Sequence, residues 1–192
     1  MSVQVKSGLA EIDYYMVGIS KLPGFDRPIK LSSNESALGM SPKAMEAVKK
    51  SIEITHLYPE VDTEALAAAI GGRFNLETNR MAFGPGSDEL LLRIVNLFSG
   101  PGQEVIHSKN AYMQFPIYAT LAGATPVAAE DNDLRYDVDS IINCLTENTR
   151  IVLVANPDNP SGTYLSGSEM ERLHRALPDN VLLIIDAAYE EF

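Results

Sequence analysis

From Arg80 onward the sequence alternates between short apolar segments and amphipathic ones, and this alternation restricts the fold more than any other feature. The apolar segments have the length of buried strands and occur at residues 81–83, 104–107, 125–129, 150–155 and 181–186. The amphipathic segments have helical spacing and occur at residues 87–98, 114–122, 137–144 and 167–177. Alternation of this kind predicts an α/β fold with three layers, α/β/α, in which helices cover both faces of a mostly parallel sheet.

The last apolar segment, Val181 to Ile185, runs directly into a carboxylate, Asp186. Five consecutive apolar residues predict a strand that is buried on both faces. In open α/β sheets, ligands bind at the carboxyl ends of the strands. Asp186 is therefore the first candidate for a functional residue.

The residues before Arg80 predict an N-terminal arm followed by two helices. Gly8–Val17 is expected to form a short helix, after which glycines and prolines interrupt regular structure. Ser41 and Pro42 suit the N-cap and the first position of a helix at about residues 42–53. Asp62 is expected to cap a second helix. We therefore divide the chain into residues 1–41, an arm and the start of a small domain, and residues 42–192, part of a larger domain.

Composition and charge argue against several classes of function. The 192 residues carry a formal net charge of −11, which disfavours a nucleic-acid partner because binding to phosphate backbones depends on clustered Lys and Arg. Cys144 is the only cysteine, so no internal disulfide is expected, and the three histidines lack the spacing of metal ligands. No apolar run reaches the roughly 18 to 20 residues of a membrane-spanning helix, and the N-terminus lacks the apolar core of a signal peptide. We expect a soluble cytoplasmic protein without a metal site.

A glycine-rich segment, Gly84-Pro85-Gly86-Ser87-Asp88-Glu89, joins a predicted strand to a predicted helix. Backbone N–H groups at the start of that helix suit a phosphate group. The segment is not a dinucleotide-binding fingerprint, because Glu89 replaces the third glycine, and it lacks the Gly-Lys-Ser/Thr of a P-loop. The alternative interpretation is a tight turn in which Ser87 caps the helix and two acids favour its positive end.

Two further candidates lie at the same predicted sheet edge as Asp186. Asn156 follows a strand and begins a proline-rich segment that ends at Gly162, and Tyr112 follows another strand and offers an aromatic face. Each has a structural alternative, a turn-initiating asparagine and a core tyrosine. Together, a phosphate cradle, an aromatic face, a hydrogen-bond donor and an acid match pyridoxal phosphate, whose protonated ring accepts electrons.

The sequence also resembles the fold-type I, pyridoxal-phosphate-dependent aminotransferases, and within them the histidinol-phosphate aminotransferase group. The resemblance covers essentially the whole chain and rests on these segments: Leu31 to Glu35 with Gly39, Ser41 and Pro42; Tyr58-Pro59-Glu60; Gly86 to Glu89; Asn156 to Gly162; and Asp186 to Phe192. It implies that residues 42–192 are the N-terminal part of the cofactor-binding large domain, which is incomplete in this chain. It also implies a homodimer that transaminates histidinol phosphate and imidazole acetol phosphate with glutamate and 2-oxoglutarate, in histidine biosynthesis.

The resemblance assigns roles around the cofactor ring. Asp186 pairs with the pyridine nitrogen, and Tyr112 stacks on the ring. Asn156 and Tyr189 hydrogen-bond the phenolic oxygen of the ring.

Other residues are implied to hold the phosphate or to lie near the substrate. Tyr58 reaches the phosphate of the other subunit across the dimer interface, and Asn34 and Tyr15 lie near the substrate. Backbone groups hold the phosphate at Gly86, Ser87 and Asp88.

The same resemblance places the lysine that bonds to the cofactor beyond Phe192, so we expect no catalytic residue in these 192 residues and no activity from them alone. Lys109 is the one lysine near the predicted site, and we expect no cofactor bond to it. Three alternatives stay open: a related threonine-phosphate decarboxylase, an aromatic aminotransferase, and a truncated protein without catalytic function.

Overall fold

The computed structural model describes residues 8–12, 18–59 and 63–191. Its contacts divide the chain into two compact units, one made of residues 1–12 and 83–192 and the other of residues 13–82. The two units are described separately below. The predicted domain boundary between residues 41 and 42 remains a prediction.

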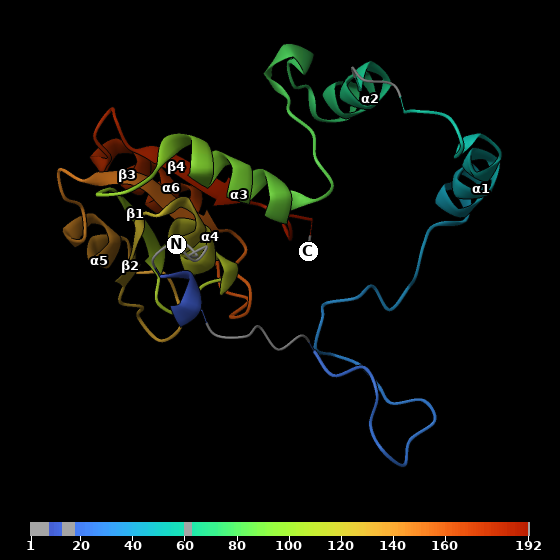
Figure 1. Ribbon diagram of the computed structural model, residues 1–192, viewed down its shortest axis with the longest axis horizontal. Helices are drawn as coiled ribbons and strands as arrows, with labels where there is room; N and C mark the ends of the chain where they lie inside the picture. The colour runs from blue at the N-terminus through green and yellow to red at the C-terminus, as the bar shows by residue number, and fades with distance from the viewer. Residues whose placement is uncertain (1–7, 13–17, 60–62, 192) are drawn as a thin grey trace, which may run out of the picture. The chain divides into compact units, whose positions relative to one another are not determined.

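The larger unit contains a parallel four-stranded sheet (Figure 1). Its strands are β1 (Glu104–Ser108), β2 (Thr125–Ala129), β3 (Thr149–Ala155) and β4 (Leu182–Asp186). Their order in the sheet is β2-β1-β3-β4, and all three neighbouring pairs are parallel. The parallel order brings the carboxyl ends of all four strands to one edge of the sheet, as the alternating sequence pattern predicts.

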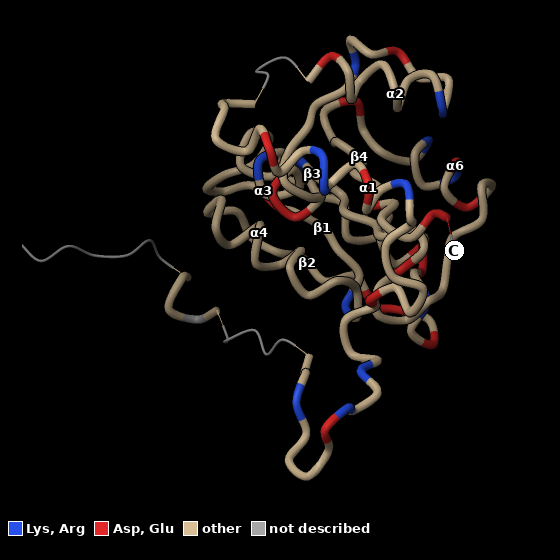
Figure 2. Tube along the Cα trace, turned by 90° about the vertical axis from the view of Figure 1, so that its right-hand side faces the viewer, with Lys and Arg blue, Asp and Glu red and all other residues tan. Residues whose placement is uncertain are grey.

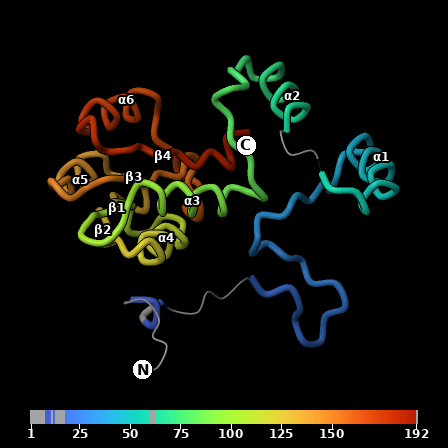
Figure 3. Tube along the Cα trace, turned by 45° about the horizontal axis from the view of Figure 1, so that its top comes forward, coloured from blue at the N-terminus to red at the C-terminus, as the bar shows by residue number. Residues whose placement is uncertain are grey.

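Four helices cover the two faces of this sheet, so the predicted three-layer fold is confirmed. Helices α5 (Val138–Asn143) and α6 (Gly167–Ala176) contribute to one buried cluster and α4 (Gln114–Ala122) to the other, and Figure 3 shows these helices around the strands. Helix α3 (Ser87–Phe98) packs with α4, since Leu91 and Val95 share a buried cluster with Phe115. The structure therefore has two apolar cores, one on each face of the sheet.

The unbroken apolar run of β3 follows from the position of this strand between two layers of helices. Ile151 and Leu153 belong to the core on the α3–α4 face, whereas Val152 and Val154 belong to the core on the α5–α6 face. Successive side chains of a strand point to opposite faces, so a central strand between two helix layers is apolar at every position.

The prediction that 181–186 is buried on both faces is wrong. Strand β4 pairs with β3 at one edge of the sheet, and its Leu182 and Ile185 are 37% and 45% exposed. Ile184 is the one residue of β4 that is buried, in the α3–α4 core. The sequence could not show this difference, because an apolar run records the composition of a strand and not its position in the sheet.

The smaller unit contains α1 (Pro42–Ser51), a 3-10 turn at Ile52–Ile54, α2 (Glu64–Phe74) and a second 3-10 turn at Thr78–Arg80. Ser41 caps α1 as predicted, because its Oγ accepts a hydrogen bond from the Ala44 N–H at 3.1 Å. The N-cap of α2 is Thr63, and the predicted cap, Asp62, lies outside the described residues.

One strand predicted before residue 84 is not observed, and one predicted helix is described only in part. Residues 81–83 form no strand, although their composition suits one. Of the helix predicted at Gly8–Val17, residues 13–17 lie outside the described residues, and residues 8–12 contain a 3-10 turn at Leu9–Glu11, in the larger unit. Short segments of this kind carry too little periodicity to fix their conformation.

Candidate cofactor site

A cavity of about 140 Å³ lies at the carboxyl edge of the sheet. It is lined by residues from the start of α3, from the loops after β1 and β3, and from the end of β4. These residues are Ser87, Asp88, Tyr112, Ala155, Pro157, Asn159, Asp186, Ala188 and Tyr189. The structure thus brings together five of the predicted cofactor-binding residues, Ser87, Asp88, Tyr112, Asp186 and Tyr189.

Asp186 ends β4 opposite Ala155, the last residue of β3. Its carboxylate accepts a hydrogen bond from the Ala188 N–H at Oδ1 (3.1 Å), and the described residues offer no hydrogen bond to Oδ2. Burial raises the pKa of this carboxyl group, the nearby Asp88 carboxylate adds to the increase, and the Ala188 N–H opposes it. A half-buried acid with an available oxygen suits a cationic partner in the cavity.

Asn156 follows β3, and its side chain is hydrogen-bonded to Leu165, nine residues further along the chain. Its Nδ2 donates to the Leu165 carbonyl oxygen at 3.2 Å, and its Oδ1 accepts from the Leu165 N–H at 2.8 Å. The side chain therefore closes the loop from Asn156 to Leu165. Pro157 and Asn159, rather than Asn156, line the cavity.

The start of α3 lies beside the cavity. Gly86 is its N-cap, with φ of 101°, and Ser87 is the first helical residue, so the alternative interpretation with Ser87 as N-cap is wrong. No side chain caps α3, whereas Ser166 and Glu169 form the predicted capping box at α6. The first N–H groups of a helix lack partners within the helix and carry a partial positive charge, so those of α3 suit an anion.

Sequence reasoning missed one residue beside the site, Tyr118 of α4. Its Oη donates a hydrogen bond to Asp88 Oδ1 at 2.5 Å, and Tyr112 Oη donates to Asp88 Oδ2 at 3.4 Å. Burial raises the pKa of Tyr118, and the hydrogen bond to Asp88 raises it further. A tyrosine within a largely apolar helix was the available indication, because a buried hydroxyl group needs a partner.

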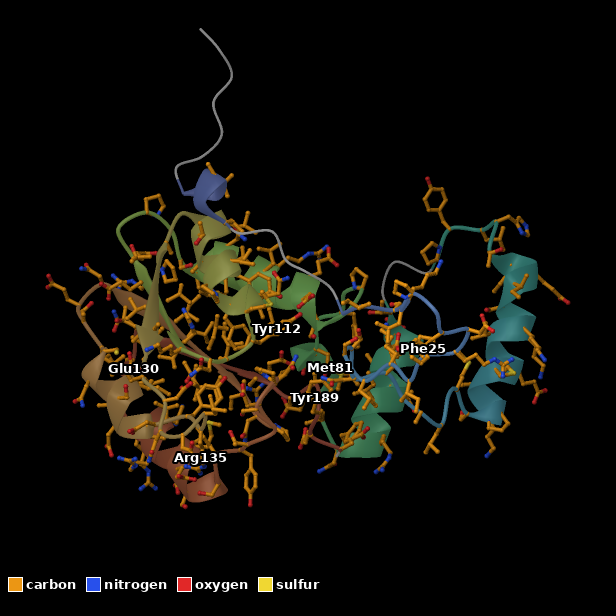
Figure 4. The ribbon with its side chains drawn as sticks, turned by 90° about the horizontal axis from the view of Figure 1, so that it is seen from below. Phe25, Met81, Tyr112, Glu130, Arg135 and Tyr189 are labelled. Atoms are coloured by element: carbon orange, nitrogen blue, oxygen red, sulfur yellow. The ribbon has the colours of Figure 1, made fainter. Side chains whose placement is uncertain are left out.

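The remaining predicted site residues lie elsewhere. Tyr58 and Asn34 belong to the smaller unit, where Tyr58 is fully exposed and Asn34 has φ of 51°. Tyr15 lies outside the described residues. Figure 4 labels Tyr112 and Tyr189, which come from the loops after β1 and β4 and line the same cavity.

Other titratable groups near the sheet edge have structural partners. Lys109 Nζ is paired with Glu130 at 2.9 Å. His107 is buried in β1, where its Nδ1 donates a hydrogen bond to the Ser108 carbonyl oxygen at 2.8 Å, and burial lowers its pKa.

Two classes of site are absent from the part of the chain that the structure describes. No group of three or more His, Cys, Asp or Glu side chains there could hold a metal ion. No helix in the described ranges is long and apolar enough to cross a membrane. Basic and acidic residues are interspersed along the chain, as Figure 2 shows.

Comparison with known proteins connects this site to one family. The family model "Aminotransferase class I and II" matches residues 26–192. The chain is 46% identical over 187 residues to a histidinol-phosphate aminotransferase of Paramagnetospirillum magneticum, covering 97% of this chain and 52% of the relative. It is 45% identical to one of Rhodospirillum centenum, covering 96% of this chain and 51% of the relative. The chain thus spans about half the length of the curated relatives it matches.

Solved structures give the same fold. The histidinol-phosphate aminotransferase of Sinorhizobium meliloti, solved in complex with pyridoxal-5'-phosphate, superposes with a TM-score of 0.79 at 30% identity, covering 82% of this chain and 43% of that one. The aspartate aminotransferase of Rhizobium meliloti superposes with a TM-score of 0.74 at 23% identity, covering 81% of this chain and 42% of that one, and supports the fold alone. The predicted resemblance is confirmed: the chain belongs to the family of class I and II aminotransferases.

Proposed function

We propose that the chain is part of a cytoplasmic, pyridoxal-phosphate-dependent enzyme that exchanges an amino group between histidinol phosphate and 2-oxoglutarate in histidine biosynthesis. Relatives that are 43–46% identical carry the name histidinol-phosphate aminotransferase, which supports this substrate. The proposal concerns the whole enzyme, because the chain spans about half the length of these relatives. The observation that carries it is the Asp186 carboxylate, which lines one cavity together with Tyr112, Tyr189 and the start of α3.

The described residues fit pyridoxal phosphate in charge, and the start of α3 leaves space for its phosphate group. Asp186 Oδ2 is available at the cavity, and the raised pKa of this acid means that its charge is poorly compensated there. A protonated pyridine nitrogen would supply that compensation. The start of α3 has no side-chain cap, and a Cβ built on Gly86 would meet nothing within 4 Å, so a phosphate group has both donors and room.

When bound, pyridoxal phosphate supplies an electron-accepting ring that stabilises negative charge at the α-carbon of an amino acid. The role of Asp186 is to keep a proton on the ring nitrogen. Tyr112 provides an aromatic face, and Tyr189 and Asn156 provide polar groups for the phenolic oxygen. For Asn156 this role requires an atom of its amide to be shared with, or released from, the Leu165 backbone.

We extend the proposal to a homodimer in which Tyr58 hydrogen-bonds the phosphate in the partner subunit. The role of Tyr58 rests on the resemblance, and its fully exposed side chain is accessible to a partner subunit. Asn34 and Tyr15 are proposed to lie near the substrate, as the resemblance implies.

A transamination assay of the whole enzyme that contains these residues tests the proposal. We expect amino transfer from histidinol phosphate to 2-oxoglutarate to be faster than transfer from phenylalanine. Asp186→Ala should reduce turnover by about a hundredfold or more, the scale of losing a group that stabilises developing charge. Asp179→Ala is the matched control, since Asp179 is an exposed acid before the same strand, and it should leave turnover unchanged.

Two results would contradict the proposal. Near-normal turnover of Asp186→Ala would remove the assigned role of this acid. Release of carbon dioxide from threonine phosphate, without a requirement for a keto acid, would instead identify a decarboxylase.

A further inference from the structure

The carboxylate of Asp88 connects three elements at the edge of the cavity. Asp88 lies in the first turn of α3, Tyr118 lies in α4, and Tyr112 lies in the loop that precedes α4. Asp88 Oδ1 accepts a hydrogen bond from Tyr118 at 2.5 Å, and Oδ2 accepts one from Tyr112 at 3.4 Å. One carboxylate therefore holds a buried tyrosine and a cavity-lining tyrosine at the same time.

The position of Asp88 makes this arrangement unusual for an acid in the first turn of a helix. A carboxylate there is normally stabilised by the helix's own free N–H groups. In α3 no side chain caps these groups, since Asp88 is bonded to the two tyrosines and Glu89 is paired with Arg93 one turn further on. The Asp88 carboxylate is thus bonded to the tyrosines and not to the N–H groups of α3, whereas Glu89 Oε1 is paired with Arg93 and Oε2 is buried near Gly84 without a hydrogen-bond partner among the described residues.

Tyr118 is held firmly enough to act as the anchor of this arrangement. Its side chain is 4% exposed and lies in the core that α3 and α4 share, together with Leu91 and Phe115. Its hydroxyl group is protonated and a hydrogen-bond donor at neutral pH, and burial raises its pKa further above the ordinary value. A charge-assisted hydrogen bond of this length is among the stronger ones in proteins.

Tyr112 is fixed from two sides. Its hydroxyl group is bonded to Asp88, and its ring meets Phe115 edge to face, with centroids 5.7 Å apart and planes at 89°. Because Phe115 is fully buried, the Tyr112 ring packs against the apolar core. The orientation of this ring at the cavity depends on the same carboxylate that Tyr118 holds.

Resting on the proposed function, we infer that Tyr118 is a positioning residue. It holds the Asp88 carboxylate away from the start of α3 and against Tyr112. The N–H groups at the start of α3 and the oriented Tyr112 ring are thereby presented to a phosphorylated planar ligand. Tyr118 acts through Asp88 and does not itself line the cavity. When Tyr118 no longer donates, the carboxylate turns toward its own helix and competes with the phosphate.

The experiment measures binding of pyridoxal phosphate and of pyridoxal to the cofactor-free whole enzyme, with Tyr118→Phe as the variant. Affinity for pyridoxal phosphate should fall about tenfold, which equals about 1.4 kcal/mol. Affinity for pyridoxal, which lacks the phosphate, should fall less. The visible circular-dichroism band of the bound cofactor should weaken, because its aromatic neighbour is less fixed. Tyr164→Phe removes the hydroxyl group of a tyrosine that is 64% exposed and away from the cavity, and should change none of these values.

A double-mutant cycle separates positioning from general stability. In an Asp88→Ala background, Tyr118→Phe should change the affinity for pyridoxal phosphate less than about twofold, because the two residues act in one pathway. If Tyr118→Phe does not fold, Tyr112→Phe keeps the ring and removes its bond to Asp88, and it should weaken the circular-dichroism band at saturating cofactor.

The outcomes for this inference and for the proposed function differ. A wild-type enzyme that binds no pyridoxal phosphate would refute the proposed function. A wild-type enzyme that binds it, with equal affinity and an equal band in Tyr118→Phe, would overturn the positioning role and leave the proposed function intact. A variant that has only a lower melting temperature, with unchanged affinities, would also overturn it.

Discussion

The backbone N–H of Asn156 donates a hydrogen bond to the carbonyl oxygen of Asp186 at 2.9 Å. This bond continues the β3–β4 ladder by one residue beyond the paired Ala155 and Asp186. The positions of two candidate cofactor residues are therefore fixed to each other by main-chain atoms. A substitution at either residue changes the chemistry of the site without removing the contact that places it.

Replacing Asp186 with asparagine should stabilise the cofactor-free enzyme at neutral pH. The pKa of Asp186 is raised in the folded protein, so ionising this group costs stability as the pH rises through that pKa. Below the ordinary pKa of an aspartate, about 4, the wild-type group is protonated in both states and the difference should disappear. Melting temperatures of the two proteins from pH 3 to pH 8, roughly the span that these pKa values set, check this prediction.

A constant difference across that range would show that the charge of Asp186 is not responsible. Addition of pyridoxal phosphate should reverse the ranking at neutral pH, because only the wild-type carboxylate compensates a protonated ring nitrogen.

Gly86→Ala should destabilise the protein and weaken cofactor binding together. The φ of 101° at this N-cap lies in the region that residues with a Cβ rarely adopt, so the substitution is expected to cost about 1 kcal/mol or more. The strain is conformational, because the added Cβ would meet nothing within 4 Å. Denaturant unfolding and a cofactor titration provide the two measurements.

Gly72→Ala is a suitable control for that substitution. Gly72 lies within α2, is exposed, and also has no atom within 4 Å of an added Cβ. Without a positive φ, alanine there should stabilise the helix by roughly 0.5–1 kcal/mol. Equal destabilisation by both substitutions would contradict the explanation based on φ.

Asn156→Ala should loosen the loop from Asn156 to Leu165. The substitution leaves the N–H and the carbonyl oxygen of Leu165 without their side-chain partners, at an expected cost of about 1–3 kcal/mol in the free energy of unfolding. Hydrogen exchange at the Leu165 amide should accelerate, and this is the specific measurement. An unchanged exchange rate at Leu165 would mean that the loop is held by other contacts.

The capping box of α6 should make stability depend on acidic pH. Arg135 and Ser166 hydrogen-bond Glu169 and lower its pKa to about 2, from an ordinary value of 4.5. Stability from this group is therefore complete above pH 4.5 and is lost as the pH falls through about 2. Glu169→Gln should have a lower melting temperature than wild type at neutral pH, and the difference should shrink steadily as the pH falls toward about 2 and be smaller at high salt. A gap that does not change with pH would contradict this assignment.

The central part of the fold could be predicted from sequence because its periodicity is strong. Helices α3 and α4 and strand β2 begin and end at the predicted residues, Ser87–Phe98, Gln114–Ala122 and Thr125–Ala129. Each is bounded by glycine or by a clear change of period, so local and tertiary preferences agree. The capping-box spacing likewise located the start of α6.

The position of the site at the sheet edge could be predicted from sequence, whereas the hydrogen bonds made by its side chains could not. Parallel strands end at one edge, so Asp186 and Tyr112 could be expected there from sequence. The bond of Asn156 to Leu165 and the contact of Tyr118 with Asp88 join residues 9 and 30 positions apart through side chains. Contacts between such residues produce no periodic pattern in the sequence. The exposure of β4 depends on the strand order, which composition does not encode.

The strand order β2-β1-β3-β4 also has a consequence for how the chain acquires its structure during synthesis. Strand β2 joins one side of β1, β3 then joins the other side, and β4 joins the outer side of β3. Each of these four described strands is added at a free edge, and none of them has to be inserted between two that are already paired. These four strands can therefore pair one after another as the polypeptide leaves the ribosome.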